Sequence, residues 1–193
     1  MIIFKQIRWR NFLSTGNHFT EIDFQKAQTN LIVGTNGTGK STVLDALTFS
    51  LFNKPFRKIT KSQLVNAANE KDCMVEIEFS TPNFDWKIVR GIKPNIFEIW
   101  KDDDLLDQNS AVNDQQKWLE ENVLKLNYKS FTQIVVLGSA SFVPFMQLSA
   151  PNRREVIEDI LDIKIFSAMG LILKERVRSC LLYTSPSPRD GIL

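Results

Sequence analysis

The stretch Gly34-Thr-Asn-Gly-Thr-Gly-Lys-Ser41 decides the fold of this chain, because it has the spacing G-x-x-x-x-G-K-S/T of a phosphate-binding loop. Its three glycines can take φ > 0, so that successive backbone N–H groups point inward around an anion. Lys40 is a mobile point charge able to reach β- and γ-phosphates, and the Ser41 hydroxyl suits one position in the octahedron of Mg²⁺. The stretch therefore predicts a nucleoside triphosphate site.

The flanking residues support this prediction. Leu31-Ile-Val33 is a short apolar run typical of a buried parallel strand, and residues 42–52 are apolar almost all round, as expected for a helix packed on a sheet. A glycine-rich turn without a ligand is the alternative, and this strand–loop–helix context disfavours it. A dinucleotide fingerprint is excluded, since Thr42 stands where its third glycine would be.

Composition bounds the remaining possibilities. The chain has 193 residues, 43% of them hydrophobic and 24% charged, which is enough for one domain with a substantial core. A net charge of +2 requires any nucleic-acid surface to be a local patch, such as the basic residues at 54–61, for which a solvated rim is the simpler interpretation. Cys73 and Cys180 lack metal or disulfide spacing. Without a signal peptide or an 18-residue apolar run, we expect a soluble cytoplasmic protein with no membrane partner.

Hydrophobic periodicity predicts the other elements. Period-two alternation indicates strands at residues 2–9 and 19–24 and an antiparallel meander of three strands at 73–100. The apolar, β-branched run 134–138 indicates a further strand, preceded by Gln133. After a helix near 113–124, a last helical stretch is expected from Ser149 and Pro151. Its apolar residues recur every three or four positions to Val177, as at the opening of a helical hairpin or coiled coil.

The resulting domain boundaries are 1–148, 149–178 and 179–193. We expect a head domain in the first range, the start of a coiled-coil helix in the second, and a non-native tail in the third, where the helical period ends and two prolines follow. The chain is accordingly expected to be the amino-terminal piece of a longer protein.

Four motifs carry a resemblance to a known family. These are Arg10-Asn-Phe12, the loop 34–41, Leu44-Asp-Ala46 and Phe131-Thr-Gln133. Together they resemble the first half of an SMC/SbcC-type ATPase head. The stretches 53–57, 90–95, 133–138 and 148–154 are similar to the phage branch of that family, the large subunits of the recombination endonucleases of T-even-like phages.

This resemblance implies an α/β fold, the amino-terminal half of a P-loop NTPase of ABC type, with an antiparallel sub-sheet and the start of a coiled-coil helix. It implies that ATP phosphates are held by Gly34, Thr35, Asn36, Gly37, Thr38, Gly39, Lys40, Ser41 and Thr42, with Mg²⁺ on Ser41. Gln133 would be the Q-loop glutamine, touching the metal and the attacking water, so that Lys40 and Gln133 are the catalytic candidates. Read without the family, Gln133 is an ordinary polar residue at a strand edge. Ser14 would approach the nucleotide, although this chain has Leu13 where family members carry arginine.

The resemblance also implies partners. Two heads would close on two ATP molecules as a homodimer and control a metallophosphoesterase nuclease subunit that acts on double-stranded DNA ends in recombination and repair, in the host cytoplasm if the protein is phage-encoded. The Walker B strand, the signature motif and the hook cysteines are missing from the sequence, so we expect weak ATP binding and little hydrolysis by this chain alone. An SMC-like DNA tether without a nuclease is the alternative, and a transporter ATPase is disfavoured because no signature motif follows Gln133.

Overall fold

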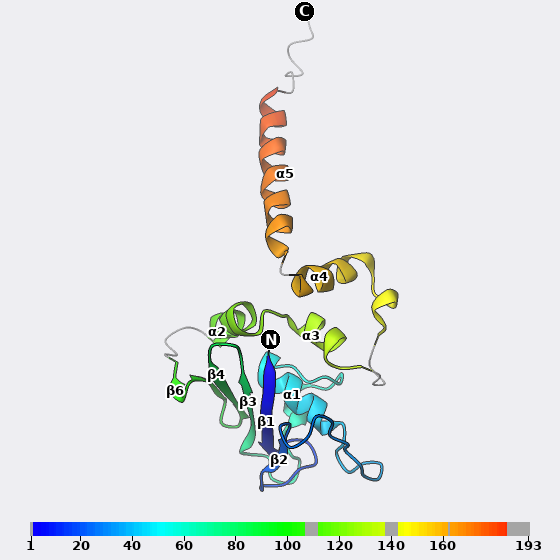
Figure 1. Ribbon diagram of the computed structural model, residues 1–193, viewed down its shortest axis with the longest axis vertical. Coiled ribbons are helices and arrows are strands. Elements are labelled where there is room, and N and C mark those ends of the chain that lie inside the picture. The colour runs from blue at the N-terminus through cyan, green and yellow to red at the C-terminus, as the bar shows by residue number, and fades with distance from the viewer. Residues whose placement is uncertain (1, 107–111, 138–142, 162, 185–193) are drawn as a thin grey trace, which may run out of the picture. The chain divides into compact units, whose positions relative to one another are not determined.

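The computed structural model describes residues 2–106, 112–137, 143–161 and 163–184, and Figure 1 shows its elements. The chain divides into two compact units, residues 1–147 and 148–193. The first contains the sheet and the phosphate loop, and the second contains two helices.

An antiparallel sheet of six strands in the order β2-β1-β3-β4-β5-β6 forms the base of the first unit. Its strands are β1 Ile3–Arg10, β2 Thr20–Asp23, β3 Cys73–Ser80, β4 Asp85–Ile92, β5 Ile96–Lys101 and β6 Asp104–Leu105. Ile77 pairs with Ile7 on one side and with Ile88 on the other, so the buried residues of three strands share one face. The alternation in the sequence therefore predicted the β1–β2 pair and the meander correctly.

One helix, α1 Thr42–Phe52, packs on the apolar face of this sheet (Figure 1). It follows the phosphate loop directly, as the sequence predicted, and is buried on nearly all sides. Asn53 ends it in the left-handed region at φ 57°, where its N–H donates to Phe49 O at 2.9 Å. The short helix η1 Lys61–Leu64 follows.

Among the described residues, three further helical segments follow the sheet in the chain and complete the first unit. They are α2 Val112–Trp118, which runs into the π-helical η2 Leu119–Leu124, then α3 Tyr128–Ile134, and finally η3 Phe145–Gln147. Leu119, Val123 and Phe131 of these segments join the core under the sheet.

Two expected strands are wrong. Leu31–Val33 forms no strand and is exposed at 87%, 46% and 78% respectively. Ile134 is the last residue of helix α3, which Asn127 caps by accepting the Ser130 N–H at 2.9 Å, and residues 135–137 form no strand. A short apolar run has no periodicity that separates a strand from a helix or an extended segment. Gly138, the end of that run, lies outside the described residues.

The second unit contains α4 Ala150–Ile160, with Ser149 at its N-cap and proline in its first turn as predicted, and α5 Lys164–Thr184. The helical range expected at 149–178 is divided between these two helices. Two contacts bridge the break between the helices: Lys164 pairs with Asp159, and the Ser167 hydroxyl donates to Glu158 at 2.6 Å. No Gly or Pro occurs at 161–164 to signal the break. The tail 185–193 lies outside the described residues, and α5 extends six residues beyond the expected boundary at 178.

Candidate nucleotide site

The phosphate loop has the backbone conformation that its glycines permit. Gly37 and Gly39 have φ values of +91° and +92°, a region that residues with a Cβ rarely adopt. Gly34 has a different role, because a Cβ there would lie 2.6 Å from Thr38 Oγ1. The loop thus needs Gly34 for close approach and the other two glycines for their dihedral angles.

Lys40 lies across its own loop. Its Nζ donates to Gly34 O and to Thr35 O, both at 2.7 Å, and Thr38 Oγ1 donates to the same Thr35 O at 2.8 Å. The Lys40 ammonium and the Thr38 hydroxyl therefore direct three hydrogen bonds at two loop carbonyls. An anion entering the loop competes with these carbonyls for the Lys40 ammonium.

A cavity of about 550 Å³ opens beside the loop and the first turn of α1. It is lined by Leu13, Ser14, Asn36, Gly37, Gly39, Lys40, Ser41, Thr42, Arg57, Gln63, Val65 and Ala67. Two of these lining residues are cations, and none of the described ones carries a carboxylate. With the helix N-terminus at its base, the cavity favours a strongly anionic ligand such as a polyphosphate.

Ser14 lies in this cavity because its loop is fixed to the segment after η1. The Asn66 side-chain amide donates to Leu13 O and to Thr15 O, both at 3.0 Å, and the Leu13 N–H donates to Leu64 O at 2.6 Å. As a result, a Cβ placed on Gly39 would lie 3.7 Å from Ser14 Oγ. The first hairpin and the phosphate loop thus meet at Ser14.

Arg57 and Gln63 line the cavity although sequence reasoning did not select them for this site. Arg57 is held by Asp45, a fully buried carboxylate in α1: the Arg57 N–H donates to Asp45 Oδ1 at 3.0 Å and its Nε to Oδ2 at 2.6 Å. The available signal was Asp45 itself. A lone acid in a helix that is otherwise apolar and buried needs a cationic partner, and the basic residues at 54–58 are the first to follow that helix in the chain.

Gln133 is not among the residues that line this cavity. It occupies the last turn of α3, where its Oε1 is buried and has no hydrogen-bond partner among the described residues. The expectation that Gln133 leads into a strand is therefore wrong, while its contact with the metal and the attacking water stays a prediction.

The residues at this cavity offer a hydroxyl ligand for Mg²⁺ but no cluster of acidic, His or Cys ligands among the described residues. Ser41, at the N-cap of α1, offers a hydroxyl beside the phosphate position. Among the described residues, no group of three or more His, Cys, Asp or Glu side chains could hold a metal. Ser41 is therefore the residue lining this cavity that we expect to hold a magnesium ion.

The class of protein follows from a family comparison. Residues 6–171 match the family model described as AAA domain, so this chain belongs to that family. It is 43% identical over 173 residues to exonuclease subunit 2 of Escherichia phage RB69 and 41% identical over 169 residues to exonuclease subunit 2 of Enterobacteria phage T4. These matches cover 90% and 88% of this chain but only 31% and 30% of the relatives, so the chain spans about a third of their length.

Less similar proteins include a DNA-repair ATPase and an Smc head domain. The chain is 28% identical over 178 residues to the DNA double-strand break repair Rad50 ATPase of Thermoplasma volcanium, covering 90% of this chain and 19% of that protein. The Smc head domain of Pyrococcus furiosus, solved with the C-terminal domain of ScpA, matches with a TM-score of 0.65 at 23% identity, covering 93% of this chain and 46% of that one. The resemblance to SMC/SbcC-type heads and the fold class are thereby confirmed.

Proposed function

We propose that this chain is the amino-terminal, ATP-binding part of the ATPase subunit of a DNA exonuclease complex. The observation that carries the proposal is the loop 34–41. It leads into α1 with two positive-φ glycines, and its Lys40 lines, together with Arg57, a cavity whose described lining has no carboxylate. The similarity of this chain to exonuclease subunit 2, which extends over 90% of its length, supports a role in DNA processing.

In the proposed binding step, Lys40 leaves Gly34 O and Thr35 O and pairs with the β- and γ-phosphates. The N–H groups of the loop and of the first turn of α1 bind the remaining phosphate oxygens. Ser41 would hold Mg²⁺, which neutralises phosphate charge when bound. Arg57 offers a second cation whose position is fixed by its hydrogen bonds to Asp45.

Hydrolysis needs a group that positions or activates water, and no described residue lining the cavity carries a carboxylate. We therefore propose that the chain alone binds nucleotide but turns over little ATP, and that catalysis requires the part of the polypeptide that the relatives have in addition. A turnover rate equal to that of a full-length relative, measured by phosphate release, would contradict this.

The proposal extends to partners through the relatives: double-stranded DNA ends, a metallophosphoesterase nuclease subunit, and a second head sharing two ATP molecules. The location would be the host cytoplasm if the protein is phage-encoded. A DNA tether of the SMC kind, without a nuclease, is the second candidate, supported by the similarity to the Smc head. The 43% identity to a phage exonuclease subunit, against 23% to the Smc head, favours the nuclease complex. Among the described residues, no helix has the length and apolar character to cross a membrane.

Binding of a fluorescent ATP analogue with Mg²⁺ tests the site. We expect saturable binding by the wild-type chain and a loss of at least about tenfold in affinity for Lys40→Ala, since a charge-assisted contact to phosphate is removed. Lys58→Ala is the matched control, because Lys58 is exposed and does not line the cavity. Equal affinity of Lys40→Ala and the control would refute the proposed site.

A further inference from the structure

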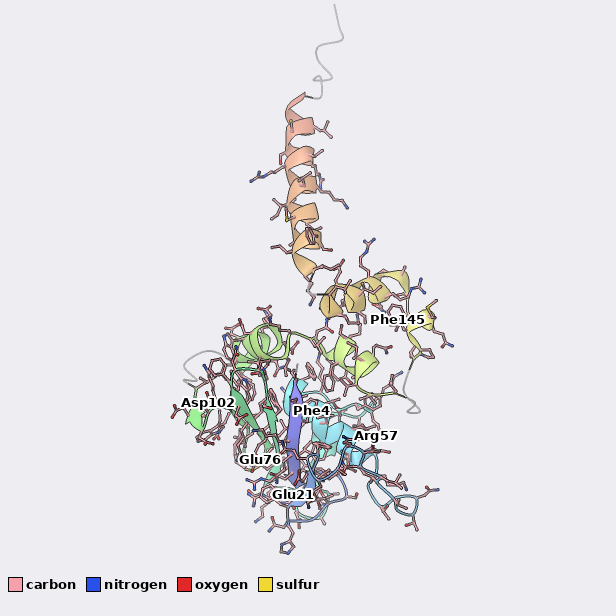
Figure 2. All side chains as sticks on the ribbon, in the orientation of Figure 1. Phe4, Glu21, Arg57, Glu76, Asp102 and Phe145 are labelled. Atoms are coloured by element: carbon pink, nitrogen blue, oxygen red, sulfur yellow. The ribbon has the colours of Figure 1, made fainter. Side chains whose placement is uncertain are left out.

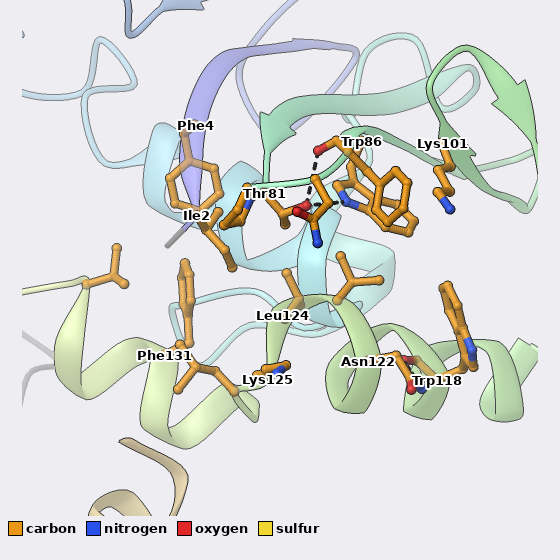
Figure 3. A pocket seen from close by; sticks show the side chains of 16 residues that line it. Ile2, Phe4, Thr81, Trp86, Lys101, Trp118, Asn122, Leu124, Lys125 and Phe131 are labelled. Atoms are coloured by element: carbon orange, nitrogen blue, oxygen red, sulfur yellow. Dashed lines mark hydrogen bonds between the residues drawn. The ribbon is translucent and has the colours of Figure 1, made fainter. Parts of the chain in front are cut away.

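A second and larger cleft, of about 770 Å³, lies in the first unit between the ends of the strands and the helical segment α2–η2–α3 (Figure 3). The sheet contributes Phe4, Trp86 and Lys101, while Trp118 and Phe131 face them from the helical side. It shares no lining residue with the cavity at the phosphate loop. Nucleotide binding therefore leaves its role unexplained.

Aromatic rings form both the floor and the rim of this cleft. Trp86 is 7% exposed and lies at the floor, whereas Phe84 and Trp118 are each 40% exposed at the rim. The Trp86 ring centroid lies 6.1 Å from that of Trp118 and 6.3 Å from that of Phe84. Large aromatic side chains that keep one surface open to solvent are typical of protein docking sites.

The rim is held in place before any ligand arrives. Trp86 Nε1 donates to Thr81 Oγ1 at 3.0 Å, and Thr81 Oγ1 in turn donates to Phe84 O at 3.1 Å, as the dashed lines in Figure 3 show. The turn between β3 and β4 is thus hydrogen-bonded to Trp86 at the floor. A pre-ordered surface of this kind loses little conformational entropy when a ligand binds.

Charge selects the kind of ligand. Lys101 and Lys125 line the cleft, and none of its described lining residues carries a carboxylate. The Lys101 ammonium lies 3.4 Å from the Phe84 ring centroid, and Lys125 is exposed at the end of η2. A ligand that buries apolar groups between the tryptophans can place a negative charge at each lysine.

We propose that this cleft binds a short apolar peptide segment of a partner protein, in which one or two carboxylates flank the apolar anchors. A nucleic-acid strand fits less well, because Asp102–Asp104 adjoin Lys101 in sequence and Asp85 precedes Trp86. A phosphodiester backbone carries charge at every nucleotide and would lie against these acids. A peptide can instead carry its negative charges only at the positions that face Lys101 and Lys125. This inference is independent of the proposed ATP site.

Selection from a phage-displayed library of random dodecapeptides, with the full 193-residue chain as target, tests the proposal. We expect enriched sequences that combine two or more aromatic or large aliphatic residues with Asp or Glu. Synthetic versions of the enriched peptides should then lose about tenfold or more in affinity for Trp118→Ala, as is usual when a rim tryptophan at a docking site is removed.

Charge-reversal variants test whether the peptides bind at this cleft or elsewhere on the surface. The double variant Lys101→Glu, Lys125→Glu should lose binding of the acidic peptides, while Lys117→Glu, exposed and next to Trp118 but outside the cleft, should keep it. Circular dichroism confirms that each variant is folded. The proposal is overturned if no consensus is enriched, if the selected peptides bind Trp118→Ala and the double variant as well as wild type, or if a thymidine oligonucleotide binds the cleft and no peptide does.

Discussion

At the scale of single residues, we expect the pair Asp45–Arg57 to stabilise both the proposed nucleotide site and the fold. The Asp45 side chain is fully buried, whereas that of Arg57 is 44% exposed. Replacing Arg57 by Met removes the guanidinium and keeps the backbone N–H of residue 57 as the donor to this carboxylate among the described residues. We expect Arg57→Met to lower the free energy of unfolding by about 2–3 kcal/mol, less than for a fully buried pair because Arg57 is partly solvated.

Urea denaturation measures this change, with Lys58→Met as the control for removing a neighbouring exposed cation. The same variant should also bind the ATP analogue more weakly, since a cation that lines the cavity is lost. Unfolding midpoints that agree between the two variants would show that the Asp45 carboxylate does not depend on Arg57.

Burial raises the pKa of the Cys73 thiol to about 12. We expect a thiol reagent at pH 8 to label Cys180, which is exposed, and to label Cys73 only after unfolding. Because the folded pKa lies above the unfolded value, Cys73 contributes stability that is complete below the unfolded pKa and is lost as pH rises toward 12. Mass spectrometry of the labelled chain gives the first result. Rapid labelling of both cysteines in the folded chain would contradict the burial of Cys73.

Sequence alone located the phosphate loop, because its glycines, Lys40 and Ser41 are consecutive in the chain. It did not locate Arg57 or Gln63. Arg57 is positioned by its contacts with Asp45, and Gln63 belongs to η1, where Leu64 O accepts the Leu13 N–H. Spacing within a short motif is visible in one sequence. A contact between segments that are distant in the chain leaves no such local pattern.

At the scale of elements, the β-sheet was the most predictable part. Strands β3, β4 and β5 each have one face on the core, so their side chains alternate with period two. The runs 31–33 and 134–137 lack this alternation, and assigning them to strands failed. In the second case a polar residue contributes: Asn127 caps α3, and that helix takes in Ile134, the first residue of the run.

Arg90 ties the end of α1 to the sheet and to α2. It is 2% exposed, its Nε donates to Ser50 O at 3.0 Å, its Nη2 donates to Gln116 Oε1 at 2.7 Å, and its guanidinium stacks 3.9 Å from the Phe97 ring centroid. Burial lowers the pKa of Arg90 to about 9, partly offset by Glu120, so the group stays protonated at neutral pH. A cation here also complements the negative end of the α1 dipole.

We therefore expect Arg90→Met to lower the free energy of unfolding by about 2–4 kcal/mol, because Ser50 O and Gln116 Oε1 lose their donor in the core. Gln116→Ala should cost about 1 kcal/mol, since it removes the donor to Leu51 O but leaves Arg90 bonded to Ser50. Chemical denaturation compares the two variants. An unfolding free energy for Arg90→Met no lower than that for Gln116→Ala would mean that Arg90 does not hold the end of α1.

At the scale of the whole molecule, the chain carries apolar surface that its own core does not use. Leu31, Ile32 and Val33 are exposed immediately before the phosphate loop, although their composition is that of a buried strand. The relatives are about three times as long as the part that this chain matches. Contiguous exposed apolar residues next to unpaired backbone promote association between copies.

The double variant Leu31→Ser, Val33→Ser should consequently stay monomeric at concentrations where the wild-type chain aggregates. Its free energy of unfolding should change by less than about 0.5 kcal/mol, because neither side chain belongs to the core. Light scattering during concentration measures the first effect and urea denaturation the second. Val112→Ser is the control. It changes one exposed apolar residue at the start of α2, outside the run 31–33, and should aggregate like wild type. Equal scattering by the double variant and this control would place the cause of association elsewhere, with the exposed apolar face of α5 as the next surface to change.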